Sequence, residues 1–153
     1  MSKKVIKLKN VFEKAVSFRT FILNQSPENR AKFMKNYIPL EISDACRERV
    51  LKCQQKLHIL GIAEGASASS QKLLPILEKL ISTSSHIELR LITGGDAAHA
   101  LEGSSKEKEM KIPTFIFMNE DFSKRTYFTK SFDSDEKVEE VIEELLVMIE
   151  KTA

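Results

Sequence analysis

The sequence predicts an α/β fold, a central mixed four-stranded sheet with flanking helices, preceded by an α-helical N-terminal extension. Residues 1–56 show helical spacing and capping serines, residues 57–92 have a strand–helix–strand pattern, and residues 114–129 have a hairpin pattern. A strand–helix–strand unit implies a parallel pair, whereas a hairpin is antiparallel, so the sheet should be mixed. Because 153 residues is the length of one ordinary domain, we expect the extension (1–56) and the remainder (57–153) to form one compact unit.

The extension is predicted to be helical throughout. Its first helical stripe lies between residues 11 and 22 and consists of Val11, Phe12, Ala15, Val16, Phe18 and Ile22. Ser26 then supplies an N-cap, and Pro27 suits the first turn of a second helix. Pro39 should end that helix, because the residue before a proline is biased away from helical angles.

Both cysteines fall on a third predicted helix, which Ser43 would cap. Cys46 and Cys53 share an apolar stripe with Val50 and Leu57. Seven helical residues separate the two cysteines by about 10 Å, whereas the Cα atoms of a disulfide lie within about 7 Å. We therefore expect two unpaired core residues rather than reactive thiols, and a reducing compartment, the cytoplasm.

From residue 57 the pattern changes to alternating strands and helices. Residues 57–63 form a short apolar run typical of a strand buried on both faces, and residues 68–82 carry apolar side chains at helical spacing. Residues 87–92 alternate between apolar and polar side chains, which predicts the next strand. A turn at residues 94–96 then leads into a less regular helix, expected from residue 96 to about residue 110.

The last part of the chain is predicted to form a hairpin and a helix. Residues 114–118 and 125–129 are its two strands. The final helix should begin at Asp133 or Ser134, because Asp133 and Glu136 have capping-box spacing.

Charge is distributed unevenly along the chain. Residues 1–56 hold 13 Lys and Arg against 5 Asp and Glu, and residues 57–153 hold 11 against 17, so the two parts carry +8 and −6. A basic part can attract an anionic partner, but these lysines are scattered and follow no recognition motif, which argues against nucleic acid as the partner. No apolar run approaches the roughly 18 residues of a membrane-spanning helix, so no membrane partner is expected.

A motif follows the first predicted strand. Ser67 and Ser70 stand in Ser-x-x-Ser spacing at the start of the predicted helix, Pro75 lies further along it, and Ile112-Pro113-Thr114 directly precedes the third strand. With the order of the elements, these features resemble the thioredoxin family. The resemblance is sharper for a bacterial subgroup that has a helical N-terminal extension and a stretch like Ile-Ala-Glu-x-Trp-Cys-Gly-Asp. Residues 62–64 match that stretch, and Ser67 replaces its attacking cysteine.

The resemblance implies a thioredoxin-like fold that has lost its redox chemistry. In thioredoxins the first strand delivers a Cys-x-x-Cys to a helix N-terminus, where free amides and the helix dipole lower the thiolate pKa. A serine hydroxyl has neither an accessible anion near pH 7 nor an oxidised state like a disulfide, so thiol–disulfide oxidoreductase activity is predicted to be absent. The resemblance also implies a cis peptide bond between Ile112 and Pro113.

The predicted ligand-binding residues are Ser67, Ser70, Ile112, Pro113 and Thr114. The simpler interpretation of the serines is helix capping, which serine performs well. In the alternative interpretation, hydroxyls and helix amides form a groove for an anionic or peptide group beside Pro113. No catalytic residue, metal or cofactor is predicted, because the three histidines are scattered without Cys or carboxylate at ligand spacing.

Three functions fit this sequence. The first is a non-catalytic binding or interaction module that presents its cis-Pro edge to a peptide or protein partner by β-strand addition. The second, implied by related transferases of the same fold, is a glutathione-binding or transferase-like protein that uses Ser67. The third is an oligomeric interaction protein that uses the basic extension. The sequence leaves the partner and the number of subunits open.

Overall fold

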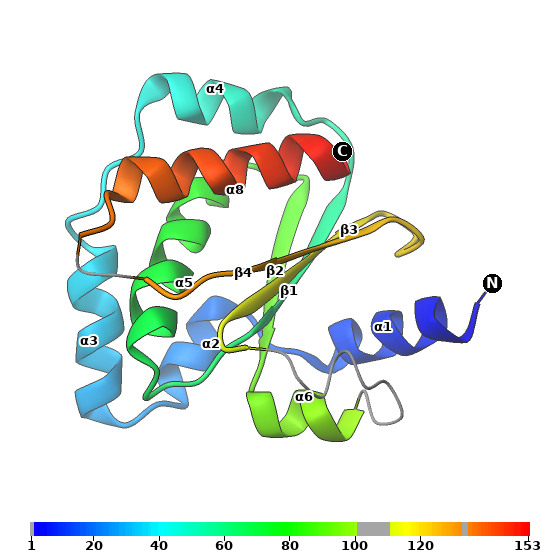
Figure 1. Ribbon diagram of the computed structural model, residues 1–153, viewed down its shortest axis with the longest axis horizontal. Coiled ribbons are helices and arrows are strands. Elements are labelled where there is room, and N and C mark those ends of the chain that lie inside the picture. The colour runs from blue at the N-terminus through cyan, green and yellow to red at the C-terminus, as the bar shows by residue number, and fades with distance from the viewer. Residues whose placement is uncertain (1, 101–110, 133–134) are drawn as a thin grey trace.

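The computed structural model describes residues 2–100, 111–132 and 135–153. Figure 1 shows how its helices surround a central sheet. The elements are α1 (Lys3–Lys14), α2 (Phe18–Leu23), α3 (Pro27–Tyr37), α4 (Asp44–Lys52), β1 (Leu57–Ile62), α5 (Ala68–Ile81), β2 (Ile87–Ile92), α6 (Gly94–Ala100), β3 (Thr114–Asn119), β4 (Arg125–Thr129) and α8 (Val138–Thr152). No helix within the described ranges is long and apolar enough to span a bilayer.

The four strands form one sheet in the order β2-β1-β3-β4. β1 is parallel to β2 and antiparallel to β3, and β4 is antiparallel to β3. The prediction of an α/β fold with a mixed four-stranded sheet is therefore confirmed.

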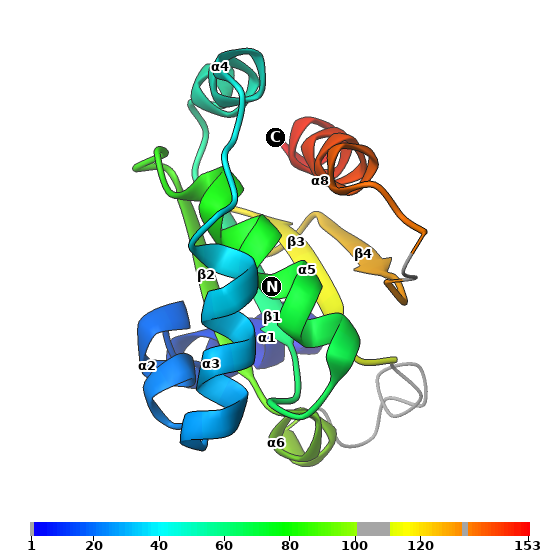
Figure 2. The same cartoon turned by 90° about the vertical axis from the view of Figure 1, so that its left-hand side faces the viewer.

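The two inner strands are buried on both faces, because a strand directs successive side chains to opposite sides. From β1, Leu57 and Ile59 enter a main core beneath α5 and α8, whereas Leu60 and Ile62 enter a second core beneath α1, called here the α1-side core. Figure 2 shows α3 running alongside α5. Both faces of β1 thus require a covering helix.

Helices of the predicted extension cover both faces. α1 contributes Val5, Leu8, Val11 and Phe12 to the α1-side core, while Phe21 of α2 and other residues up to Cys53 belong to the main core. Ser26 and Ser43 accept the capping hydrogen bonds that start α3 and α4, and Pro27 is the first residue of α3. The boundary expected after residue 56 lies between α4 and β1, although the helices before it and the sheet after it share both cores.

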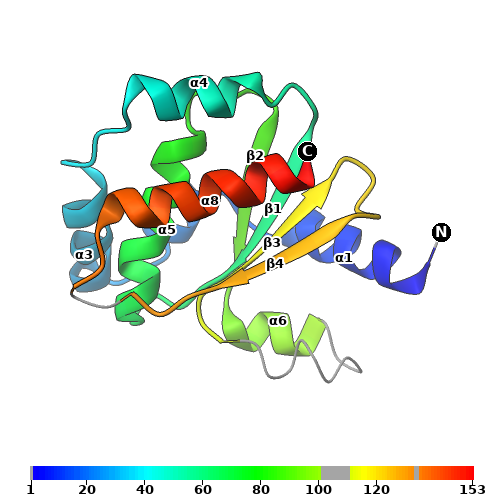
Figure 3. The ribbon, with the colours of Figure 1, turned by 45° about the horizontal axis from the view of Figure 1, so that its top comes forward.

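α4 lies beside the C-terminal helix α8, as Figure 3 shows. Arg49 of α4 donates hydrogen bonds to the carboxylates of Glu143 and Glu150 on α8. Both carboxylates are exposed, and surface pairs of this kind contribute about 0–1 kcal/mol each. The two ion pairs join α4 to α8 but add little to the overall stability.

The single helical stripe predicted over residues 11–22 is wrong. α1 ends at Lys14, α2 begins at Phe18 behind an N-cap at Ser17, and the segment between them is extended. Val16 forms an antiparallel bridge with Leu91 at the outer edge of β2, with N···O distances of 2.9 and 2.6 Å. Apolar periodicity did not reveal this break because Ala15 and Phe18 are packed against the cores on either side of it.

The predicted start of the last helix is also wrong. α8 begins at Val138 behind Lys137, which makes no side-chain capping bond. Asp133 and Ser134 lie outside the described residues, and Glu136 pairs with Lys130 at 2.9 Å. The less regular helix expected over 96–110 begins at Gly94 as α6, and its predicted part after Ala100 lies outside the described residues.

His58 of β1 is a half-buried aromatic residue on the α1 side of the sheet. Its ring stacks on Phe122 at a centroid distance of 4.6 Å and meets the edge of Phe12 at 4.9 Å. Its Nδ1 is buried and has no hydrogen-bond partner among the described residues. Burial therefore lowers the pKa of the imidazole below its usual value.

We predict that His58→Phe reduces the loss of stability on acidification. Because the unfolded state has the higher histidine pKa, it binds more protons than the folded state below about pH 6.5, which destabilises the wild type there. Phenylalanine preserves the ring stacking and takes up no proton. Urea unfolding at pH 8 and pH 5.5 should show a smaller drop for His58→Phe, whereas a variant of the exposed His86, His86→Gln, should keep the wild-type drop. Equal drops in wild type and His58→Phe would contradict this account.

We predict that Glu78→Gln stabilises the fold at neutral pH. Glu78 lies on α5, its Oε2 is buried without a hydrogen-bond partner in the described part of the chain, and burial raises the pKa of its carboxyl. A raised pKa means that ionisation disfavours the folded state at pH 7, and that this penalty disappears as the pH falls below the unfolded value near 4.5. The gain in unfolding free energy should therefore be present at pH 7 and shrink toward pH 4.5. The control Glu41→Gln, at an exposed loop position, should change stability by less than about 0.5 kcal/mol at either pH.

Candidate functional site

Sheet register brings the predicted site residues to one end of the sheet. Thr114, the first residue of β3, pairs with Ile62, the last residue of β1. Ser67 follows Ile62 by five residues along the chain, and Pro113 directly precedes Thr114. The start of α5 and the turn before β3 therefore both lie where β1 ends.

Ser67 is the N-cap of α5. Its Oγ accepts a hydrogen bond from the N–H of Ser70 at 3.1 Å, and its side chain is half-buried. The capping interpretation of Ser67 thus matches the geometry. The hydroxyl hydrogen of Ser67 donates to no acceptor among the described residues.

The two following serines bind other segments. Ser70 is 0 % exposed, and its Oγ accepts from the N–H of Glu64 at 3.3 Å, which ties the helix to the loop before it. Ser69 is half-buried, and its Oγ accepts from the N–H of Phe132 at 3.1 Å. A ligand at the surface cannot reach Ser70 in this arrangement, so its predicted binding role requires movement of the loop.

Three residues that were not predicted as site residues hold the loop before α5. They are Gln25, Gln71 and Gly94. Gln71 donates from Nε2 to the carbonyl of Gly65 at 2.8 Å. A Cβ on Gly65 would lie 1.7 Å from Oε1 of Gln25, so the α2 end packs directly on this glycine. Gly94, at the start of α6, donates its N–H to Oε1 of Glu64 at 2.7 Å. These partners come from separate segments, and no pattern in the sequence marks them.

The turn before β3 is tightly held. The Ile112–Pro113 peptide bond is cis. Pro113 is buried, and its carbonyl accepts from Oγ1 of Thr129 at 3.0 Å. Thr114 is 3 % exposed and pairs with β1 on one side and β4 on the other. Ile112 is half-buried beside Gly94, so it is the member of this turn with accessible surface.

The cysteines lie away from the start of α5. Cys53 is the C-cap of α4 and belongs to the main core, where burial raises the pKa of its thiol. Cys46 is half-buried on α4 and packs against the same core. In the described ranges no group of three or more His, Cys, Asp or Glu is placed to hold a metal ion.

Two solved structures have the same fold at low sequence identity. An HIV epitope scaffold aligns with a TM-score of 0.81 at 19 % identity, covering 95 % of this chain and 98 % of that one. A Pseudomonas aeruginosa protein of unknown function aligns with a TM-score of 0.80 at 19 % identity, covering 93 % and 96 %. These identities are low, so the likeness shows the fold alone.

A comparison with curated proteins finds no match. A family model described as thioredoxin, in contrast, matches residues 15–145, from the end of α1 into α8. This match covers the sheet, the start of α5 and the turn before β3. The chain therefore belongs to the thioredoxin family.

Proposed function

We propose that this chain is a non-catalytic thioredoxin-family protein that binds an extended peptide or protein segment at the cis-Pro edge, through the backbone of Ile112 next to Pro113 and Thr114. One observation carries the proposal. The peptide N–H and C=O of Ile112 make no hydrogen bond with another described residue, although Thr114, two residues later, is fully paired in the sheet. An unpaired backbone group directly before a strand is a place where an extended segment adds by backbone pairing.

The absence of redox turnover forms part of the proposal. The chain has two cysteines, and the start of α5 carries Ser67 and Ser70 instead. Cys53 is buried with a raised thiol pKa, which lowers the fraction of reactive thiolate at neutral pH. Neither residue at the helix start supplies a sulfur nucleophile.

A peptide fits this place better than a small anion does. The carboxylate of Glu64 lies in the loop that leads to Ser67 and is held there by Gly94. This carboxylate offsets part of the attraction that the helix amides exert on an anion, so a small anionic ligand gains less here than at a helix start with no carboxylate nearby. The glutathione alternative and the oligomeric alternative that uses the basic extension stay predictions.

We predict no disulfide turnover by the wild type and a low thiol pKa after Ser67→Cys. A thiolate at the N-terminus of α5 would meet helix amides, which lower a cysteine pKa from about 8.5 to roughly 3.5–7.5. Insulin reduction measures turnover, and the pH dependence of alkylation by iodoacetamide measures the pKa. The wild type, with Cys46 and Cys53 only, is the matched background.

Wild-type insulin reduction would contradict the proposed lack of redox activity. A Ser67→Cys thiol with a pKa near 8.5 or above would show that the start of α5 lacks the electrostatics of a thioredoxin site. Alkylation of the wild type at the same rate as the variant would assign the signal to Cys46 instead.

We predict that linear dodecapeptides selected on the protein by phage display bind at the edge. Titration of a selected peptide into ¹⁵N-labelled protein should shift the amide resonances of Lys111, Ile112 and Thr114 most. Ile112→Pro removes the N–H donor and should weaken binding at least about tenfold, whereas Ile112→Val keeps the donor and should bind as the wild type does.

Either of two results would overturn this binding mode. One is that the enriched peptides shift resonances elsewhere and leave Lys111–Thr114 unchanged. The other is that a folded Ile112→Pro variant binds with wild-type affinity. Circular dichroism establishes whether the variant is folded, and if it is not, the shift map of the wild type decides.

A further inference from the structure

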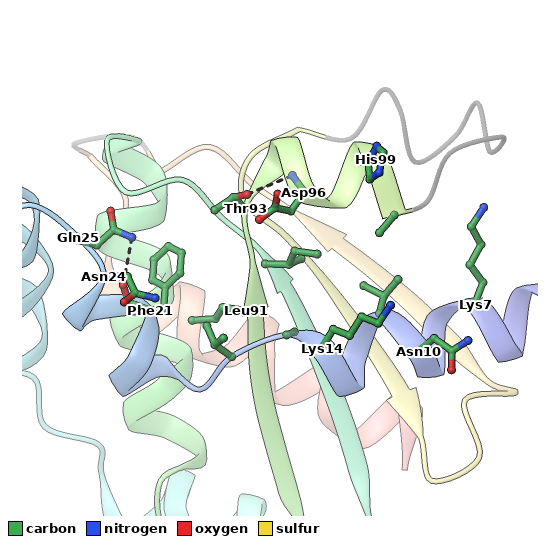
Figure 4. Close-up of a pocket in the computed structure, with 15 residues that line it drawn as sticks. Lys7, Asn10, Lys14, Phe21, Asn24, Gln25, Leu91, Thr93, Asp96 and His99 are labelled. Atoms are coloured by element: carbon green, nitrogen blue, oxygen red, sulfur yellow. Dashed lines mark hydrogen bonds between the residues drawn. The ribbon is translucent and has the colours of Figure 1, made fainter.

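A cavity of about 710 Å³ lies between α1, α2 and α6, and none of the five predicted site residues lines it. It is lined by residues in and next to α1, α2, the end of β2 and α6 (Figure 4). Its size is within the range of roughly 300–1,000 Å³ that is common for small-molecule sites.

The floor of the cavity is apolar. It is formed by Val11, Ala15, Val16, Phe21, Leu91 and Ile92. Val16 and Leu91 exchange both hydrogen bonds of their bridge, so these backbone groups of the floor are already paired. The apolar side chains of the floor favour an apolar ligand surface over water.

The walls carry charge of both signs. Figure 4 shows Lys7 and Lys14 on the α1 wall, across the cavity from Asp96 and His99 on α6. The two lysines are seven residues apart, so they share one face of α1. The lining therefore contains two ammonium groups and one carboxylate, and its positive charge is concentrated on α1.

We propose that this cavity binds a small amphipathic monoanion, with an apolar chain on the Val11–Leu91 floor and a carboxylate beside Lys14. The apolar floor favours a ligand with an aliphatic chain, and the lysines of the α1 wall favour a ligand with a negative charge. Asp96 opposes a second negative charge and places the carboxylate on the side of α1. The ligand class is thus a carboxylic acid with a medium-length aliphatic chain.

Decanoate, below its micelle concentration, is the probe for this proposal. Isothermal titration calorimetry of decanoate with the full-length protein should show saturable binding of one decanoate per protein molecule. Lys14→Glu should weaken that binding at least about tenfold, because it reverses the charge beside the carboxylate. The matched control is Lys9→Glu, which makes the same charge change at an exposed position of α1 outside the cavity and should change the affinity by less than about twofold.

Two further ligands separate the contributions of the negative charge and of the aliphatic chain to the affinity. Decanol has the same chain without the charge and should bind at least about tenfold more weakly than decanoate. Hexanoate has the charge with a shorter chain and should also bind at least about tenfold more weakly, because it buries fewer methylene groups.

The proposal is overturned if decanoate shows no saturable binding at 2 mM, if Lys9→Glu weakens binding as much as Lys14→Glu, or if decanol binds as tightly as decanoate. Amide shifts on decanoate binding should fall on α1, α2 and residues 91–99. Shifts confined to Lys111–Thr114 would overturn the cavity assignment and leave the proposed peptide edge standing. Failure of the peptide experiments, in turn, would leave the cavity result unaffected.

Discussion

Antiparallel pairing between β1 and β3 sets Thr114 opposite Ile62, and parallel pairing sets Ile62 opposite Ile92 of β2. These two registers bring the loop before α5, the turn before α6 and the turn before β3 to one end of the sheet. Because β1 is buried on both faces, a slip of one residue would exchange the side chains of its two cores, so the register is strongly determined. The hydrogen bond from the N–H of Gly94 to Glu64 then joins the turn before α6 to the loop before α5.

The serines at the start of α5 show how a thioredoxin-type helix terminus is satisfied without a thiol. A helix N-terminus presents amides that have no partner within the helix. Ser67 binds one of them, while Ser69 and Ser70 use their hydroxyls to hold Phe132 and Glu64. Most polar groups here are therefore engaged within the chain. The backbone of Ile112 makes no hydrogen bond with another described residue, and for that reason the proposed recognition depends on this backbone and not on the hydroxyls.

Elements with clear apolar periodicity were predictable, and contacts between distant segments were not. α5 and the four strands follow from spacing in the sequence, and the Ser67 cap follows from serine before an apolar helix. The contacts of Gln25 and Gln71 with Gly65 could not be foreseen, because each is a polar residue whose role depends on where another segment lies. The break at Val16 was missed for the same reason, since its pairing partner Leu91 is far along the chain.

That break also connects the two candidate surfaces. With α1 ending before Val16, the extension closes the edge of β2, and the cavity forms between α1 and α6. Thr93 lines the cavity, and the next residue, Gly94, donates to Glu64 in the loop before α5. Cδ1 of Ile112 lies 3.2 Å from the position that a Cβ on Gly94 would take, so the turn that follows Thr93 also contacts the residue on which the proposed peptide binding depends. The cavity and the proposed peptide edge are therefore built on neighbouring residues of one turn.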